Sequence, residues 1–229
     1  MNYIIEGIKE SINMLLNFDK ELYSIIFLSL SVSCLATFLS SVFFIPIGIY
    51  LGITEFKFKK IFSRLLFTSM SIPSVIVGLI IAITFTRNGP LGFLDIMYTA
   101  ESMIVAQFIL VSPLILGLTY NLGKSRGKEI EKLGITLGAN KLQIIVLIIK
   151  ELKNDIFINI ITAFSRAISE VGAVMVVGGN IKGYTRVMTT SIAMFNSMGD
   201  YSMAIALGIV LLFISFIVNI ITYTNYVED

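Results

Sequence analysis

Residues 22–54 read LYSIIFLSLSVSCLATFLSSVFFIPIGIYLGIT, a run of 33 residues without a charged side chain. As an α-helix this run is about 50 Å long, at 1.5 Å per residue, which exceeds the roughly 30 Å hydrocarbon core of a bilayer. A helix of this length must tilt or extend beyond the membrane. The run therefore predicts a membrane-spanning helix, which indicates that the whole chain is an integral membrane protein.

Four further apolar segments follow along the chain. Of the 229 residues, 56% are hydrophobic and 14% are charged, whereas about 25% are charged in soluble domains. The mean hydropathy is +0.89. We therefore expect an all-α integral membrane protein with a single transmembrane domain over residues 1–229, a bundle of about five helices. The expected spans are 22–54, 62–87, 101–123, 153–179 and 201–226, with a long connection at 124–152.

The segment before the first span is amphipathic. Its apolar residues recur at helical spacing, opposite a polar set: Ile4, Ile5, Ile8, Ile12, Leu15 and Leu16 face Glu6, Lys9, Glu10 and Asn13. This pattern is typical of an interfacial helix lying on the membrane surface. A helix packed against the bundle fits the pattern equally well.

The basic residues are distributed unevenly between the two sides. With five spans, the connections 55–64 and 124–153 share one side and carry eleven of the seventeen basic residues, whereas the other side carries five. The positive-inside rule places the richer side in the cytoplasm. We therefore expect a multi-pass protein of the cell (plasma or inner) membrane, with its N-terminus outside and its C-terminus, Glu228-Asp229, in the cytoplasm.

Several classes of function are excluded by composition. The chain has no histidine, which removes histidine-ligated metal, bis-histidine haem and histidine general bases. The sequence Gly123-Lys124-Ser125 imitates the end of a phosphate-binding loop, but that motif needs a glycine at position 118, which is Leu118. We expect no catalytic residues, no metal and no cofactor in this chain. Because the chain has no ATPase site, the energy for any driven process must come from another subunit.

Arg166 and Glu170 interrupt the fourth apolar segment and lie four residues apart on one helical face. Ionisable side chains at this depth are costly and rarely face lipid. Two interpretations remain open: a structural ion pair that fixes helix packing, or part of a translocation path. Because arginine before glutamate is the less favourable order within a helix, a partner on another helix is also open. The candidate polar residues of this region are Arg166, Ser169, Glu170, Gly172, Gly178, Gly179 and Asn180.

Two prolines and a stripe of small residues complete the spans. Pro73 and Pro113 remove backbone hydrogen bonds inside apolar segments and are hinge candidates. In the first span, small hydroxyl residues recur at helical spacing, which permits close helix contact: Ser29, Ser33, Thr37 and Ser40. We interpret this stripe as packing.

The connection 124–152 predicts a short helix with a smooth face. Gly134 and Gly138 are four residues apart beside an apolar edge that includes Leu133 and Leu137. Two glycines in a helix cost roughly 1 kcal/mol each relative to alanine. Close docking of a partner protein would offset that cost. The alternative is a flexible loop between spans.

This connection resembles the cytoplasmic motif of type I ABC importer permeases. Gly138 stands at the motif glycine and Ala139 follows it, while Ile148 stands at the motif isoleucine ten residues later. Lys132-Leu133-Gly134 replaces the usual Glu-Ala-Ala, and Lys150-Glu151 replaces Leu-Pro. The resemblance implies that Gly134, Gly138, Ala139 and Ile148 couple the protein to an ATPase subunit.

Nearly the whole chain resembles the oxyanion branch of these permeases. The block Arg166–Gly172, the turn Gly178-Gly179-Asn180-Ile181 and the segment Thr185–Thr190 are most similar to the tungstate type, with molybdate and sulfate permeases as the alternatives. The resemblance implies a second permease copy, two ATPase subunits that bind ATP and magnesium, an external oxyanion-binding protein and no nucleic acid. A membrane anchor or scaffold without transport is the alternative from another class.

Overall fold

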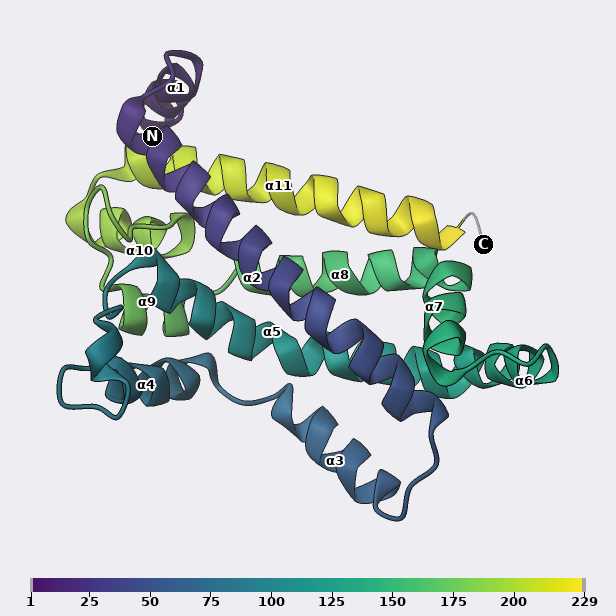
Figure 1. The fold of residues 1–229 in the computed structure, drawn as a ribbon. Helices are drawn as coiled ribbons and strands as arrows, with labels where there is room; N and C mark the ends of the chain where they lie inside the picture. Colours follow the sequence, from purple (N-terminus) through teal and green to yellow (C-terminus); the bar gives the residue numbers. More distant parts are fainter. Residues whose placement is uncertain (1, 228–229) are drawn as a thin grey trace.

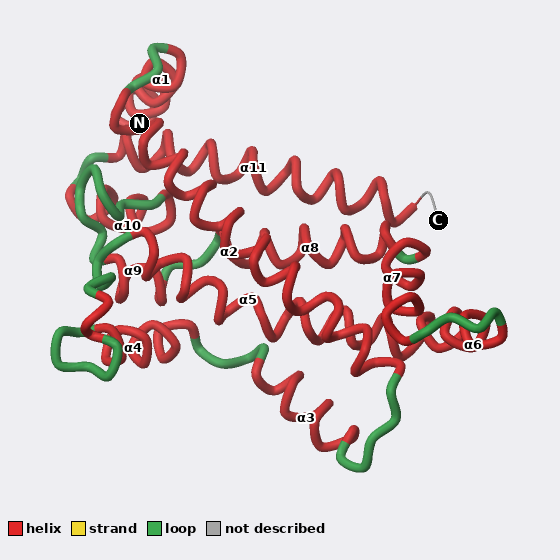
Figure 2. Tube along the Cα trace, in the orientation of Figure 1, coloured by secondary structure: helices red, strands yellow, loops and turns green. Residues whose placement is uncertain are grey.

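The computed structural model describes the backbone of residues 2–227 and the side chains of residues 7–221. The described part is all helix and loop, without a strand, as the sequence predicts (Figures 1 and 2). The α-helices are α1 (Asn2–Leu16), α2 (Lys20–Ile53), α3 (Lys59–Ser69), α4 (Ser74–Phe85), α5 (Ala100–Leu122), α6 (Lys128–Thr136), α7 (Lys141–Glu151), α8 (Lys153–Ile168), α9 (Gly172–Gly178), α10 (Met188–Met198) and α11 (Tyr201–Val227). A 3-10 turn η1 (Gly92–Leu94) and a π-helical turn η2 (Gly123–Gly127) complete the order.

Three of the helices are long and apolar enough to cross a bilayer by themselves: α2, the continuous helix that begins with α5, and α11. Two further spans exist only as bent pairs, α3 with α4 at 91° and α8 with α9 at 57°. The described chain thus has up to five spans. The expected spans 62–87 and 153–179 each correspond to one of these bent pairs, and each is broken near its middle.

The two hinge candidates behave differently. Pro73 directly precedes α4 in an extended conformation, so it lies at the 91° bend, where a proline cannot continue the preceding helix. Pro113 lies inside α5, which continues through it without interruption. A helix tolerates such a proline when packing satisfies the freed carbonyl. The first proline therefore marks a break, whereas the second does not.

The pair α2 and α5 forms the centre of the bundle (Figure 1). The two helices approach closely because Gly48 and Gly52 of α2 face the backbone of α5 and η2. The Ser40 and Ser112 hydroxyls also join the helices, at 3.1 Å. Ser29, Ser33, Thr37 and Ser40 are all buried, which confirms that this stripe serves packing.

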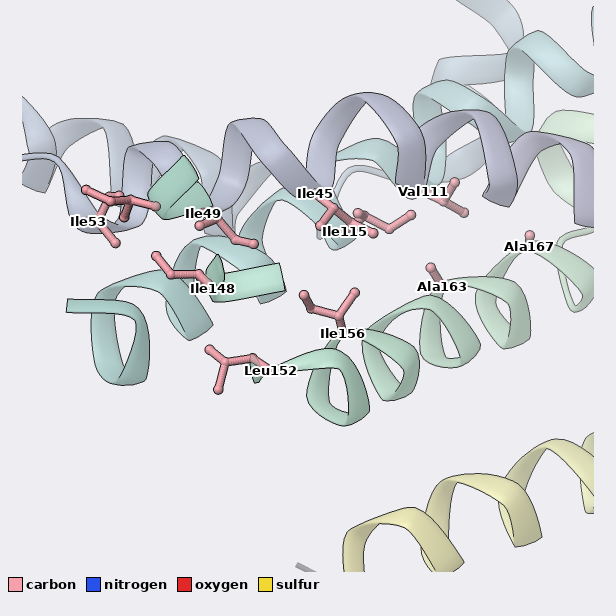
Figure 3. Close-up of a cluster of buried hydrophobic side chains, with 11 residues drawn as sticks. Ile45, Ile49, Ile53, Val111, Ile115, Ile148, Leu152, Ile156, Ala163 and Ala167 are labelled. Carbon is pink, nitrogen blue, oxygen red and sulfur yellow. The ribbon is translucent and has the colours of Figure 1, made fainter. Parts of the chain in front are cut away.

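A cluster of aliphatic side chains ties α7 to this centre. Figure 3 shows Ile148 of α7 lying between Ile49 and Ile53 of α2 and Leu152, at the start of α8. The same cluster continues along α8 to Ala163 and Ala167. One close-packed cluster thus joins α7 to α2, α5 and α8.

The two basic connections lie at the same end of the bundle. In Figure 1 the end of α2, the start of α3 and the α6–α7 pair lie together, whereas α1 and α10 lie at the opposite end. This arrangement agrees with the predicted topology, while the orientation in the membrane stays a prediction. Glu228 and Asp229 lie outside the described residues.

Helix α1 packs against the start of α11. Ser202 donates a hydrogen bond to the Glu10 carboxylate at 2.7 Å, while Ile12 and Leu16 remain exposed. The helix thus packs against the bundle, as one of the two interpretations predicts, and also has exposed apolar residues, while its position on the membrane surface stays a prediction. The side chains of Ile4, Ile5 and Glu6 lie outside the described residues.

Candidate functional site

The break between α8 and α9 holds the predicted ion pair. Arg166 Nη1 donates to Glu170 Oε2 at 2.8 Å, so the pair forms within one turn of the same segment and not with another helix. Glu170 Oε1 accepts from the backbone N–H of Ala173 at 3.2 Å. This carboxylate therefore satisfies one of the N–H groups at the start of α9 that have no helical partner.

Two neighbouring helices hold the same break. Gln107 of α5 donates through Nε2 to the carbonyl of Ala167 at 3.0 Å, and Thr189 of α10 donates to the carbonyl of Glu170 at 2.7 Å. These bonds satisfy carbonyls freed by the end of α8, which matters where no water competes. Sequence reasoning gave neither residue a role at the break, because Gln107 belongs to no motif and Thr189 was noted only as part of the segment Thr185–Thr190.

The two charges of the pair differ in exposure. The Glu170 side chain is 4% exposed, whereas the Arg166 side chain is 43% exposed. Ser169 is exposed beside Arg166. A guanidinium and a hydroxyl at the depth of an apolar span therefore face away from this chain's own core. Such a group is stable in a membrane only if it faces water or another protein surface.

The half-helices that follow the two breaks pack against each other. A Cβ added to Gly78 of α4 would lie 2.7 Å from Ala173 Cα of α9, and one added to Gly172 would lie 2.6 Å from Val75 Cγ2. Contacts this close require glycine on each side. Gly172, a predicted path candidate, thus lies at the α4–α9 contact, and the two bent spans are joined through their second halves.

The predicted turn after α9 is separated from the ion pair by the length of that helix. Gly179 and Asn180 have left-handed backbones, with φ of 69° and 52°. The Thr185 hydroxyl donates to the Gly178 carbonyl, and Asn180 Oδ1 accepts from Thr190 Oγ1 at 2.9 Å. These residues therefore terminate α9 and fasten α10. The structure does not bring Gly178, Gly179 and Asn180 together with Arg166.

One carboxylate binds both cations of the loop before α10. Glu21 of α2 forms ion pairs with Lys182 at 2.6 Å and with Arg186 at 3.1 Å. Arg186 also lies over the ring of Phe195 at 5.5 Å. Helix α10 itself was missed from the sequence, since its eleven residues were interpreted as part of a connection.

The connection 124–152 is an ordered helical hairpin of α6 and α7, not a single helix or a flexible loop. The predicted glycine face is wrong. Gly134 is buried, with its absent Cβ 3.0 Å from Ile144 Cγ1 of α7. Gly138 lies beyond the end of α6 at φ 79°, where its N–H bonds the Ile135 carbonyl. The first glycine permits the hairpin to close, and the second turns the chain.

Ile148 lies inside the protein, and its role in coupling stays a prediction. It is 0% exposed, in the core cluster of Figure 3, so it cannot touch a partner protein and instead anchors the hairpin. Ala139 is half-buried at the corner, where its N–H bonds the Gly134 carbonyl at 2.9 Å. The exposed apolar residues of the hairpin define what we term the hairpin surface: Leu133, Ile135, Leu137, Leu142 and Val146.

Two ion pairs attach the hairpin to the spans. Arg126 of η2 donates to Asp155 of α8 at 2.6 Å, and Lys128 of α6 pairs with Glu55, which follows α2. The hydrogen bond from Lys128, followed by that from Lys59, holds the pKa of Glu55 below its ordinary value. Charged groups and close packing thus both attach the hairpin to the bundle.

Comparison with known proteins agrees with this architecture. Residues 44–224 match the model of the family described as binding-protein-dependent transport system inner membrane component. The tungstate uptake system permease protein TupB of Peptoclostridium acidaminophilum is 60% identical over 224 residues, which cover 98% of each chain. The protein of the same name from Campylobacter jejuni is 34% identical over 223 residues, 97% of this chain and 93% of the relative.

A third relative has a broader name. The molybdate/tungstate transport system permease protein WtpB of Methanocaldococcus jannaschii is 31% identical over 202 residues, 86% of this chain and 80% of the relative. These similarities confirm the resemblance seen in the sequence and leave the anchor alternative without support. The chain therefore belongs to the family of binding-protein-dependent transport system inner membrane components, as a multi-pass membrane permease.

Proposed function

We propose that this chain is the membrane-spanning subunit of an ATP-driven importer for tungstate. The observation that carries the proposal is the 60% identity, over almost the full length of both chains, with a tungstate uptake permease. Tungstate and molybdate have the same charge and shape, so the relative named for both ions makes molybdate the second candidate substrate. Sulfate is the third, because sulfate permeases are related at 25–28% identity.

The energy for transport would come from a separate ATPase subunit that binds ATP and magnesium. The hairpin surface supports this role, since five exposed apolar side chains project from a hairpin fixed by ion pairs at its base. Leu137 and Leu142 are each 75% exposed. An apolar patch of this kind on a polar connection marks a protein-binding site. Pressure on this surface would reach α2, α5 and α8 through the core around Ile148.

A second copy of the chain would complete the path. Arg166 projects from one copy at the depth of the spans, and a two-fold axis would place the corresponding surface of the partner near it. Two guanidiniums and the adjacent Ser169 hydroxyls would line a polar route suited to a dianion. Glu170 would fix the position of each guanidinium without projecting its own charge into the route.

An external binding protein would deliver the ion, and the family description, which names a binding-protein-dependent transport system, supports this role. In this arrangement the N-terminus and α10 lie outside, and the hairpin and the C-terminus lie in the cytoplasm. Selection among tungstate, molybdate and sulfate would then occur in the binding protein. The permease would supply a positively charged route for the anion.

Deletion of the gene tests the proposal. A strain that lacks this chain should lose accumulation of tungsten from low external tungstate, measured by mass spectrometry of washed cells, and expression of the chain should restore it. The Leu137→Asp variant should reach the membrane without restoring uptake, while Lys141→Gln serves as a control beside the hairpin surface. Unchanged tungsten uptake together with lost sulfate or molybdate uptake would reassign the substrate.

A further inference from the structure

A basic cleft lies where the end of α2, the start of α3 and the end of α5 meet. Its volume is about 800 Å³. One carboxylate and five cations line it: Glu55, Lys57, Lys59, Lys60, Arg64 and Lys124. The path and the hairpin surface use none of the five cations. The cleft is therefore a separate feature whose charge calls for an anionic partner.

Internal contacts account for only two of these charged groups. Lys59 is buried, and its Nζ donates to the carbonyls of Gly52 at 2.7 Å and Thr54 at 2.8 Å, so it caps the end of α2. Glu55 accepts from Lys59 and from Lys128 of the hairpin. The only carboxylate in the cleft is thus already engaged and does not neutralise the remaining cations.

Four cations remain without an acidic partner. Among the residues whose side chains the structure describes, Lys57, Lys60, Arg64 and Lys124 form no ion pair. All four are exposed. Four neighbouring like charges repel one another, and an anion bound among them relieves that repulsion.

Apolar side chains beside the cleft indicate the kind of anion. Phe58, Ile61 and Leu65 are 60%, 54% and 66% exposed, and they alternate along the chain with the free cations. Figure 1 shows α3 diverging from the bundle at this point. Cations mixed with exposed aromatic and aliphatic residues are typical of a segment at the membrane–water interface. A small soluble anion would need the charges but not the apolar residues.

We infer that this cleft binds the phosphate headgroup of an anionic phospholipid from the adjoining leaflet. The cations hold the phosphate, while Phe58, Ile61 and Leu65 contact the acyl chains. Because Glu55 bonds both Lys59 in the cleft and Lys128 of α6, the bound lipid lies next to the attachment of the hairpin. The inference goes beyond the transported ion and holds whichever oxyanion the protein carries.

Native mass spectrometry of the purified full chain tests the inference. Titration with phosphatidylglycerol and with phosphatidylcholine should show preferential binding of phosphatidylglycerol. The Lys60→Gln/Arg64→Gln variant should weaken that binding at least tenfold, because each cation near a lipid surface contributes on the order of fivefold. The matched control Lys141→Gln/Lys153→Gln removes two exposed cations at the same end but outside the cleft, and should bind like the original protein.

Each contrary result overturns the inference. Equal binding of the two lipids, or equal loss in both double variants, would show that no headgroup site exists. Displacement of phosphatidylglycerol by excess inorganic phosphate would identify a site for soluble anions, and displacement on addition of the ATPase subunit would identify a protein interface. A photoreactive phosphatidylglycerol provides a test without substitutions: it should label residues 57–64, and labelling confined to other segments would refute the site.

Discussion

Arg166 and Glu170 form an ion pair of 2.8 Å across the end of α8, and the same carboxylate accepts from the N–H of Ala173 at 3.2 Å, in the first turn of α9. One side chain thus connects the two halves of a broken span. The carboxylate is buried while the guanidinium is exposed. The pair therefore serves packing through Glu170 and presents a positive charge through Arg166, so the two interpretations raised by the sequence are compatible.

Substitution of Glu170 separates these two roles. Glu170→Ala should lower the free energy of unfolding by about 1–3 kcal/mol, because it leaves a buried N–H and a guanidinium without their acceptor. Glu170→Gln keeps an oxygen for Ala173 and should lose less. Thermal unfolding in detergent measures both, and an alanine variant as stable as the original protein would contradict the bridging role.

The contact between α2 and α5 depends on Gly52. A Cβ there would lie 2.5 Å from the Tyr120 carbonyl oxygen and 2.8 Å from the Lys124 nitrogen, both backbone atoms. We expect Gly52→Ala to destabilise the fold by about 1–3 kcal/mol, the usual cost of overpacking. Gly208→Ala in α11 is the matched control, since no atom lies within 4 Å of its Cβ. Equal melting temperatures for the two variants would refute the close approach.

The corner of the hairpin requires a left-handed residue at Gly138, where φ is 79° and no atom surrounds the absent Cβ. Gly138→Val should therefore disturb the corner through backbone strain of about 1–3 kcal/mol. Gly138→Asn, which tolerates this conformation, should be close to neutral. Co-purification of the ATPase subunit measures the effect. If asparagine and valine reduced co-purification equally, the glycine would serve direct contact and not the turn.

The attachment of the hairpin to α2 should weaken in acid. Because hydrogen bonds from Lys128 and Lys59 lower the pKa of Glu55, its contribution is present above the ordinary carboxyl pKa, about 4.3, and is lost as the pH falls through the lower native value. Spin labels on Lys57→Cys and Glu131→Cys, with Cys34→Ser, should give one narrow distance distribution from about pH 5 to pH 8.

The same labels test the role of Glu55 directly. As the pH falls through the lowered native pKa of Glu55, the distance distribution should broaden, since the carboxyl becomes protonated. Glu55→Gln should show the broad distribution at every pH. A narrow distribution in Glu55→Gln at neutral pH would mean that packing alone fixes the hairpin.

Much of the fold follows from local patterns in the sequence. The run from Leu22 to Thr54 predicts α2 almost to the residue, because an uncharged segment can satisfy its backbone in lipid only as a helix. The spacing of Arg166 and Glu170 predicts their pairing, since both lie on one helical face. The small residues from Ser29 to Ser40 recur at helical spacing, so they also lie on one face of a helix and predict a packed face.

Features that depend on contacts between distant segments could not be predicted. Pro73 signals a break, but the 91° bend depends on the packing of α4 against α9 through Gly78 and Gly172. Gly134 and Gly138 share a helical spacing, yet α6 ends between them, so their common face does not form. Ile148 follows the family spacing, but only the fold of α7 shows that it points into the core.

The central claim is that this chain, with an ATPase, moves tungstate across a bilayer. Its most direct test is tungstate entry into proteoliposomes that contain the chain, its ATPase subunit and the external binding protein, measured as trapped tungsten. We predict that tungsten accumulates only when magnesium and ATP that can be hydrolysed are present. This accumulation should be lost with Leu137→Asp. An assembled complex that hydrolyses ATP in response to the loaded binding protein, yet traps no more tungsten than ATP-free vesicles, would contradict the account.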